Sequence, residues 1–266
     1  MSRPMFPPGA DPGASFPELL KRVGLSPAYE GAESSLHAGA GVSVPHATTC
    51  VALRFADGVV MAGDRRATSG NLISHRGMEK VVQADLHSGV AIAGAAGPAM
   101  EMIKLFQLQL EHYEKVEGSS LSLEGKANQL SMMVRSNLPA AMQGMVVVPI
   151  FAGFDLRREN GRLFTYDVTG GRYEEHDYVA TGSGMLHAGT VIKVAWREEL
   201  SRADAVALAC KGLWEAADAD SATGGPDALR RIYPVVATIT ADGWQRLGDD
   251  ELAGVFQTIA EGVTSR

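Results

Sequence analysis

The most regular feature of the chain is an alternation of apolar and polar positions that begins just after residue 48. Apolar side chains recur at every second position through residues 51–55, and a second apolar run follows at 59–62. The two runs are separated by Asp57-Gly58, a dipeptide that suits the left-handed backbone of a tight hairpin turn. The pattern predicts a β-hairpin.

The same turn signal recurs at Asn160-Gly161, Gly170-Gly171 and Asp242-Gly243. Strands that are joined by tight hairpins run antiparallel. The sequence therefore predicts mainly antiparallel sheets, which argues against a doubly wound or barrel-shaped α/β fold.

Two helices are expected between the early and middle strands. Apolar residues fall at helical spacing in residues 99–113 and again in 127–141. Pro139 is expected to disturb the last turn of the second helix, because proline lacks a backbone N–H.

A second pair of helices is expected at roughly 184–199 and 202–218. The latter opens with Ser201-x-x-Asp204, which has the form of a capping box. The order is strands, helix pair, strands, helix pair, strands. Two stacked antiparallel sheets between two helix layers would bury every apolar face, so the pattern predicts one α+β domain.

Residues 1–47 differ from the rest of the chain. They are rich in proline, glycine, alanine and serine, and such a segment buries too little apolar surface to offset its ordering entropy. Composition alone leaves two interpretations open, a disordered tail and a removable pro-segment.

Charge and length exclude several classes of protein. A net charge of −7 over 266 residues gives no electrostatic reason to expect nucleic acid or an anionic membrane as partner. The longest apolar stretch, 145–154, is about half of what a membrane span needs, and no secretory signal begins the chain. The two cysteines, Cys50 and Cys210, form no metal motif and fit a reducing cytosol. We expect a cytoplasmic protein without a metal or cofactor.

The candidate catalytic residues are weak when taken singly, since each also fits a strand, turn, surface or helix-cap position. Together they resemble the proteasome β subunits. The stretch from Thr48, TTCVALRFADGVVMAGDRRATSGNLISHRGMEKV, is similar to the start of the mature subunits, with Asp64 16 and Lys80 32 positions beyond Thr48. Counting from Thr49 breaks both intervals. The resemblance continues through 91–94, 181–184 and 220–225 and covers essentially all of residues 48–266.

This resemblance implies that Thr48 is an N-terminal nucleophile. A threonine hydroxyl needs a base, and a free α-amino group titrates at about 7.7–8.0, so an N-terminal threonine carries its own base. That requires removal of residues 1–47, which makes a propeptide the better interpretation of the leader. Lys80 would lower the pKa of the Thr48 hydroxyl, and Asp64 would pair with Lys80.

Further roles follow from the same resemblance. Ser183 and Asp220, aided by Thr223, would hold the amino terminus and its water. The backbone N–H of Gly94 would donate to the developing oxyanion. The backbone groups of Thr68 and Ala96 would pair with the substrate as an added strand.

The family's specificity pocket corresponds to six positions that are all apolar here. If they line a pocket, large apolar residues before the cut bond are preferred; the alternative is that some of them belong to the core. These positions are Ala67, Met78, Val82, Ile92, Ala96 and Met100.

Three departures from the family pattern stand out. Ala47 precedes the nucleophile where glycine is usual, and glycine eases the backbone turn that self-cleavage needs, so slower processing is expected. Cys50 replaces a β-branched residue and is expected to pack as a strand residue. Thr223 replaces a serine and keeps the hydroxyl.

The resulting prediction is a four-layer αββα sandwich, with a propeptide at 1–47 and a catalytic domain at 48–266. It would hydrolyse peptide bonds through an acyl-enzyme on Thr48. Family resemblance implies stacked seven-membered rings with a companion α subunit, and the leader resembles those of actinobacterial β subunits. By analogy, an ATPase ring would deliver tagged, unfolded substrates.

Three alternatives remain open. The first is the simpler two-component bacterial peptidase of the same fold, whose subunits are shorter and carry little or no propeptide. The second is a catalytically silent ring subunit, although such subunits generally lose Thr48, Asp64 or Lys80. The third is an N-terminal-nucleophile amidase that acts on a small molecule, which the spacing of these three residues disfavours.

Overall fold

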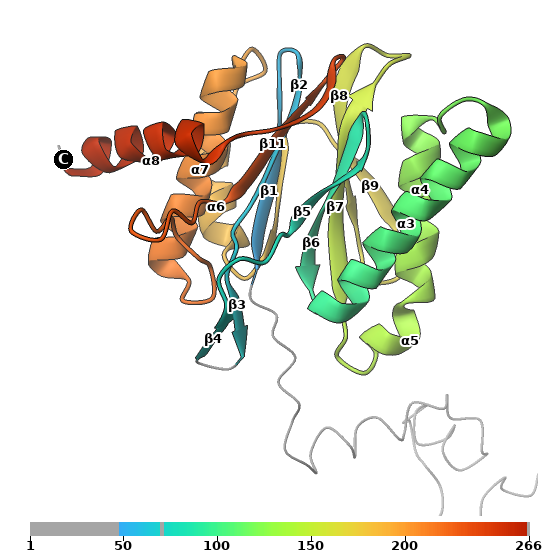
Figure 1. The fold of residues 1–266 in the computed structure, drawn as a ribbon, viewed down its shortest axis with the longest axis horizontal. Helices are drawn as coiled ribbons and strands as arrows, with labels where there is room; N and C mark the ends of the chain where they lie inside the picture. Colours follow the sequence, from blue (N-terminus) through green and yellow to red (C-terminus); the bar gives the residue numbers. More distant parts are fainter. Residues whose placement is uncertain (1–47, 70–71, 265–266) are drawn as a thin grey trace, which may run out of the picture. The chain divides into compact units, whose positions relative to one another are not determined.

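Two five-stranded antiparallel sheets pack face to face at the centre of the structure (Figure 1). The computed structural model describes residues 48–69 and 72–264, all within the compact unit Ser43–Arg266. Ala47 and the predicted propeptide lie outside the described residues.

Neighbouring strands are antiparallel throughout both sheets. The first sheet has the order β10 (Tyr178–Gly182), β1 (Thr49–Phe55), β2 (Gly58–Gly63), β11 (Val235–Thr240), β12 (Gly243–Arg246). The second has the order β5 (Val81–Asp85), β6 (Ser88–Gly94), β7 (Val147–Asp155), β8 (Asn160–Tyr166), β9 (Arg172–Glu175). A separate hairpin is formed by β3 (Ala67–Ser69) and β4 (Leu72–His75).

Helices cover the outer face of each sheet (Figure 1). The first sheet is covered by α6 (Met185–Ala195), α7 (Arg202–Ala219) and α8 (Asp249–Thr264). The second is covered by α3 (Ala96–Glu117) and α4 (Leu123–Ser136), which the short α5 (Leu138–Ala141) follows. The predicted four-layer α+β sandwich is confirmed. Within the described part of the chain, no helix is both long and apolar enough to cross a membrane.

Three apolar cores hold the four layers together, one under each helix layer and one between the sheets. Strand β1 shows why its sequence alternates. Val51 and Leu53 face the core under α6 and α7, while Cys50 and Ala52 face the second sheet. A strand in the middle of such a sandwich is buried on both faces, and successive side chains point to opposite faces.

Hairpins form at all four predicted places, but three of the turn signals are displaced from the turn itself. Gly58 and Gly243 open β2 and β12, so the turns before these strands are 56–57 and 241–242. Asn160-Gly161 does not form a turn: it opens β8 and pairs with Asp155 and Phe154, so the turn is 156–159. The physical reason for glycine at 161 is a close approach between the sheets. A Cβ atom there would lie 2.6 Å from the carbonyl of Gly58.

The helix predictions needed two corrections. Helix α4 ends at Ser136, before Pro139, and α6 ends at Ala195, four residues earlier than the expected boundary. Helix α8 was not predicted from the sequence. Its Phe256 stacks on Tyr233 and Trp214, with ring centroids 6.0 and 6.3 Å apart, which fastens the helix to the first core.

The second core depends on a cluster of aromatic rings, which gives a test of the fold. Phe151 is fully buried and lies between Phe106, in an edge contact, and Phe164, in a stacked one. Phe151→Ala is expected to lower the free energy of unfolding by about 3–5 kcal/mol, because it leaves a cavity. Chemical denaturation measures the loss, with the exposed Leu229→Ala as the matched control. Equal midpoints for the two variants would contradict this packing.

Candidate active site

Strand ends from both sheets meet at one edge of the sandwich and carry the predicted catalytic residues. Thr48 precedes β1, Asp64 follows β2, and Ser183 follows β10, which are neighbours in the first sheet. Lys80 precedes β5 and Gly94 ends β6 in the second sheet. Because adjacent strands run antiparallel, the start of one lies beside the end of the next, and residues far apart in sequence come together.

Asp64 and Lys80 form a buried ion pair at the centre of this edge. The Lys80 ammonium lies 2.7 Å from Asp64 Oδ1, and both side chains are completely buried. Lys80 also donates to the carbonyl of Arg66 at 2.5 Å. Asp64 accepts three backbone N–H groups, from Thr49 on Oδ1 and from Arg66 and Gly224 on Oδ2, each at 2.9 Å.

These extra hydrogen bonds explain how the pair is tolerated. Taking two charges out of water is unfavourable, and their mutual attraction offsets that penalty only with good geometry and satisfied lone pairs. Asp64 meets both conditions. Its contact with Thr49 places the pair one residue from Thr48, so a fixed positive charge lies beside the start of β1.

Ser183, Asp220 and Thr223 form a second polar group. Ser183 Oγ donates to Asp220 Oδ2 at 2.5 Å, Thr223 Oγ1 donates to the same oxygen at 2.6 Å, and the N–H of Ala222 donates to Oδ1 at 3.1 Å. Burial alone would raise the pKa of Asp220. The hydrogen bonds from Ser183, Thr223 and Ala222 outweigh it, so the net pKa is lowered and the carboxylate form is favoured.

The backbone at Thr48 is held by the end of β10. Its carbonyl accepts the N–H of Ser183 at 2.8 Å, and Ser183 Oγ lies 3.4 Å from the same oxygen. Gly182 has φ +96°, and a Cβ atom there would lie 1.8 Å from the Thr48 carbonyl oxygen. Only glycine permits this approach.

Gly94 also requires glycine, for a reason that the sequence analysis did not give. Its φ is +114°, and a Cβ atom would lie 2.1 Å from the carbonyl oxygen of Val146. The requirement comes from the backbone of this chain, besides any crowding of a substrate. Thr68 lies in β3, opposite Ile73, and Ala96 begins α3. Both are half-buried, so their backbones lie near the surface.

The six predicted pocket residues divide into two sets. Ile92 is buried in the core under α3 and α4, and Met78, Val82 and Met100 pack against that core while half-exposed. These four therefore share one apolar cluster that reaches the surface. Ala67, in β3, and Ala96, in α3, are half-buried and are not among the residues of this cluster.

Sequence reasoning missed three residues that hold the ion pair: Thr49, Arg66 and Gly224. Arg66 acts mainly through its backbone, and its guanidinium donates to the carbonyl of Ser221 at 2.8 Å, which ties the loop after α7 to β2. A signal for Arg66 did exist. An aspartate often accepts the N–H of the residue two positions on, and Arg66 stands two positions after Asp64.

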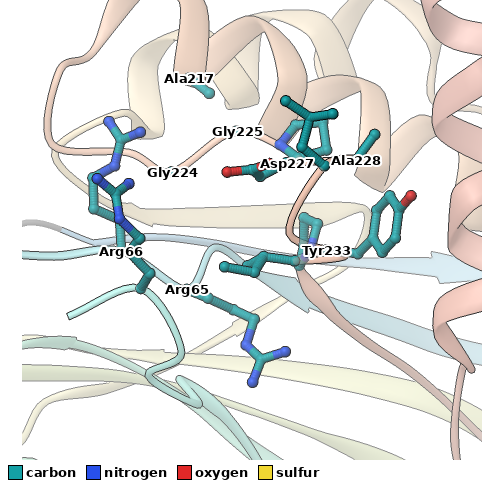
Figure 2. A pocket seen from close by; sticks show the side chains of 13 residues that line it. Arg65, Arg66, Ala217, Gly224, Gly225, Asp227, Ala228 and Tyr233 are labelled. Carbon is teal, nitrogen blue, oxygen red and sulfur yellow. The ribbon is translucent and has the colours of Figure 1, made fainter.

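A cavity of about 460 Å³ borders the loop that carries Gly224 (Figure 2). It is lined by Arg65, Arg66, Asp227 and Tyr233 among others, and it includes none of the predicted catalytic or pocket residues. In Figure 2 the side chains of Arg65 and Arg66 run in different directions from neighbouring backbone positions, so they do not converge on one point.

Cys50 is a packed strand residue. It is completely buried, and its thiol contacts the carbonyl oxygen of Ile92 at 3.6 Å. Burial raises the pKa of the Cys50 thiol to about 12, although the positive charge of Lys80 opposes this shift. At neutral pH the thiol is therefore protonated and unreactive.

Comparison with known proteins identifies the family. The two antiparallel sheets between two helix layers form the α+β sandwich of the N-terminal-nucleophile hydrolase fold. Residues 44–229 match the proteasome subunit family. The chain therefore belongs to the proteasome subunit family, as a β-type subunit, and family membership implies protease activity and assembly with other proteasome subunits.

Three relatives, each named proteasome subunit beta, support this assignment. The relative from Acidimicrobium ferrooxidans is 55% identical over all of this chain and 96% of its own length. The relative from Streptomyces griseus is 55% identical over 92% of this chain and 84% of its own, and that from Acidothermus cellulolyticus is 56% identical over 81% and 76%.

The ion pair gives a prediction about stability. Lys80→Met is expected to lower the free energy of unfolding by about 3–5 kcal/mol, because it leaves the Asp64 charge buried without its ammonium partner. Asp64→Ala is expected to lower it further, because three backbone N–H groups also lose their acceptor. Denaturation midpoints measure both.

The control is Lys115→Met, which breaks an exposed ion pair with Glu111 on α3 and is expected to leave the midpoint nearly unchanged. A midpoint for Lys80→Met that equals the control would contradict a buried, strongly coupled pair.

Thiol chemistry tests the assignment of Cys50. Burial also raises the pKa of Cys210 to about 12, so both thiols are expected to resist iodoacetamide at pH 8 in the folded protein. Both are expected to react after denaturation, and intact mass counts the added groups. Rapid alkylation of Cys50 in the folded chain would show that it is accessible and a rival nucleophile.

Proposed function

We propose that this β-type subunit is a threonine endopeptidase whose nucleophile is the Thr48 hydroxyl. One observation carries the proposal: the buried Asp64–Lys80 pair shares Asp64 Oδ1 with the backbone N–H of Thr49, the residue directly after Thr48. A fixed ammonium beside a buried threonine at the start of a strand is what activation of a weak hydroxyl nucleophile requires.

The base in this proposal is the α-amino group of Thr48 itself, after the bond from Ala47 has been cut. A free α-amino group has a pKa of about 7.7–8.0, so a substantial fraction is neutral at physiological pH. It takes the proton from the Thr48 hydroxyl, either directly or through a water. The Ser183–Asp220–Thr223 group supports this role. The Ser183 hydroxyl donates a hydrogen bond to Asp220, so the lone pairs of its oxygen stay available to accept an N–H of the amino group.

The hydroxyl oxygen then attacks the substrate carbonyl, and the N–H of Gly94 is proposed to stabilise the resulting oxyanion. The amino group returns its proton to the leaving amine, and an acyl-enzyme forms on Thr48. A water, deprotonated by the same amino group, hydrolyses the ester and restores the enzyme. The positive charge of Lys80 favours each anionic form of the Thr48 oxygen.

The leader has a chemical function in this scheme. While residue 47 is attached, the nitrogen of Thr48 is an amide and cannot act as a base. We infer that residues 1–47 are a propeptide removed by the chain itself, at Ala47–Thr48, and that residues 48–266 are the mature subunit. Alanine at 47 is expected to slow this step relative to glycine.

Substrate preference and assembly are finer proposals. The apolar cluster of Met78, Val82, Ile92 and Met100 supports a preference for large apolar residues before the cut bond. The relatives' name, proteasome subunit beta, supports assembly with other proteasome subunits. Stacked seven-membered rings with a companion α subunit follow by analogy with the family. A regulatory ATPase ring, tagged unfolded substrates and a cytoplasmic location follow by analogy with the family.

Intact mass and peptide hydrolysis test the proposal together. The full chain, co-expressed with its companion subunit, is expected to lose residues 1–47 and to cleave a peptide with a large apolar residue before the cut bond. Thr48→Ala is expected to stay uncut by its own activity and to lose at least about a thousandfold in kcat, since the covalent step is gone. The control is Thr258→Ala, on the exposed surface of α8.

Each outcome decides between the alternatives. Full activity in rings of Thr48→Ala would refute the proposal that the Thr48 hydroxyl is the nucleophile. An uncut, inactive wild-type chain in fully assembled rings would instead indicate the silent structural subunit, and assembly without a companion subunit would favour the simpler two-component peptidase.

A further inference from the structure

Thr49 lies between the two polar groups of the site and contacts both. It is completely buried. Its backbone pairs with Asp64 in both directions: its N–H donates to Oδ1 at 2.9 Å, and its carbonyl accepts the Asp64 N–H at 3.1 Å. Its hydroxyl lies 2.5 Å from the hydroxyl of Thr223 and accepts the N–H of Gly184 at 3.0 Å.

The protons in this chain of hydroxyls can be assigned by counting. A hydroxyl has one proton to donate, and a carboxylate only accepts. Thr223 uses its proton on Asp220 Oδ2, at 2.6 Å. Thr49 must therefore be the donor in its 2.5 Å contact with Thr223. The hydrogen bonds run in one direction, from Gly184 through Thr49 and Thr223 to Asp220.

The space around this hydroxyl is filled. A Cβ atom on Gly184 would lie 2.5 Å from Thr49 Oγ1, 2.8 Å from Thr223 Oγ1 and 3.0 Å from the Ala216 methyl group. In Thr49→Val a methyl group takes the place of the hydroxyl, and a methyl group neither accepts nor donates a hydrogen bond. This change would leave the N–H of Gly184 and a lone pair of Thr223 unsatisfied in a buried place.

We propose that Thr49 is a positioning residue that couples the Asp64–Lys80 pair to the Ser183–Asp220–Thr223 group and so fixes Thr48 between them. This inference rests on the proposed function, in which Thr48 is the nucleophile. Thr49 acts through Thr223 and Asp220, and not on the substrate. Its loss is therefore expected to change the rate of the chemical step and to leave substrate binding largely intact.

Two substitutions at Thr49 separate its hydroxyl from its shape. Thr49→Val keeps the branched shape without the hydroxyl, and Thr49→Ser keeps the hydroxyl. In assembled rings of the full chain, Thr49→Val is expected to lower kcat for peptide hydrolysis by about 10- to 100-fold with KM within about twofold. Thr49→Ser is expected to keep kcat within about threefold of wild type. Activity is normalised to the processed fraction measured by intact mass.

The matched control is Thr238→Val, in β11 of the same sheet. Thr238 is also buried, but its hydroxyl has a long 3.4 Å contact with Arg202 and lies outside the two polar groups. It is expected to keep the wild-type kcat. Equal kcat for Thr49→Val and wild type would overturn the proposal, as would an equal loss in Thr49→Ser and Thr49→Val.

A stability measurement keeps this test distinct from the test of the proposed function. If Thr49 and Thr223 share one chain of hydrogen bonds, the shifts in denaturation midpoint for Thr49→Val and Thr223→Val are expected to be non-additive. The pair Thr238→Val and Thr223→Val is expected to be additive. Additive shifts for the first pair would overturn the coupling even in an active enzyme. An inactive wild type with non-additive shifts would instead refute the proposed function and leave the coupling in place.

Discussion

The ion pair between Asp64 and Lys80 sets the conditions for the rest of the site. Two opposite charges at 2.7 Å, both completely buried, are stable only while every other lone pair of the carboxylate is satisfied. Asp64 therefore needs N–H donors from the start of β1, the segment that follows β2 and the loop after α7. These three segments, far apart in sequence, are held at one point by one carboxylate.

The sheet topology makes this convergence possible. In an antiparallel sheet the start of each strand lies beside the end of its neighbour, so one edge of the sandwich collects residues from β1, β2 and β10. The close approaches at that edge leave room for glycine alone at Gly94 and Gly182. The core between the two sheets brings Lys80, at the start of β5, against the first sheet. Fold and site therefore depend on the same strand registers.

The sequence predicted the parts of this account that follow from local pattern or from spacing. Alternation through 51–55 predicts a buried strand, and the resemblance places Asp64 and Lys80 at fixed intervals from Thr48. The sequence pattern did not predict the turn at 156–159. Asn160-Gly161 has the form of a turn signal, but Gly161 is needed for a close contact between the two sheets. The role of Thr49 was missed because it depends on backbone groups and on one buried hydroxyl, which a sequence pattern does not report. The role of Arg66 could have been found from its place two positions after Asp64.

The central claim is that Thr48 supplies both the nucleophilic hydroxyl and the basic amine. A peptide epoxyketone tests this directly, because it forms a stable ring only with a hydroxyl and a free amine on the same residue. After treatment of the assembled subunit, tandem mass spectrometry is expected to find Thr48 as the first residue of the chain. It is expected to carry one inhibitor, attached through both its hydroxyl oxygen and its amino nitrogen. An actively hydrolysing subunit whose adduct lies on another residue, or which forms none, would contradict the account.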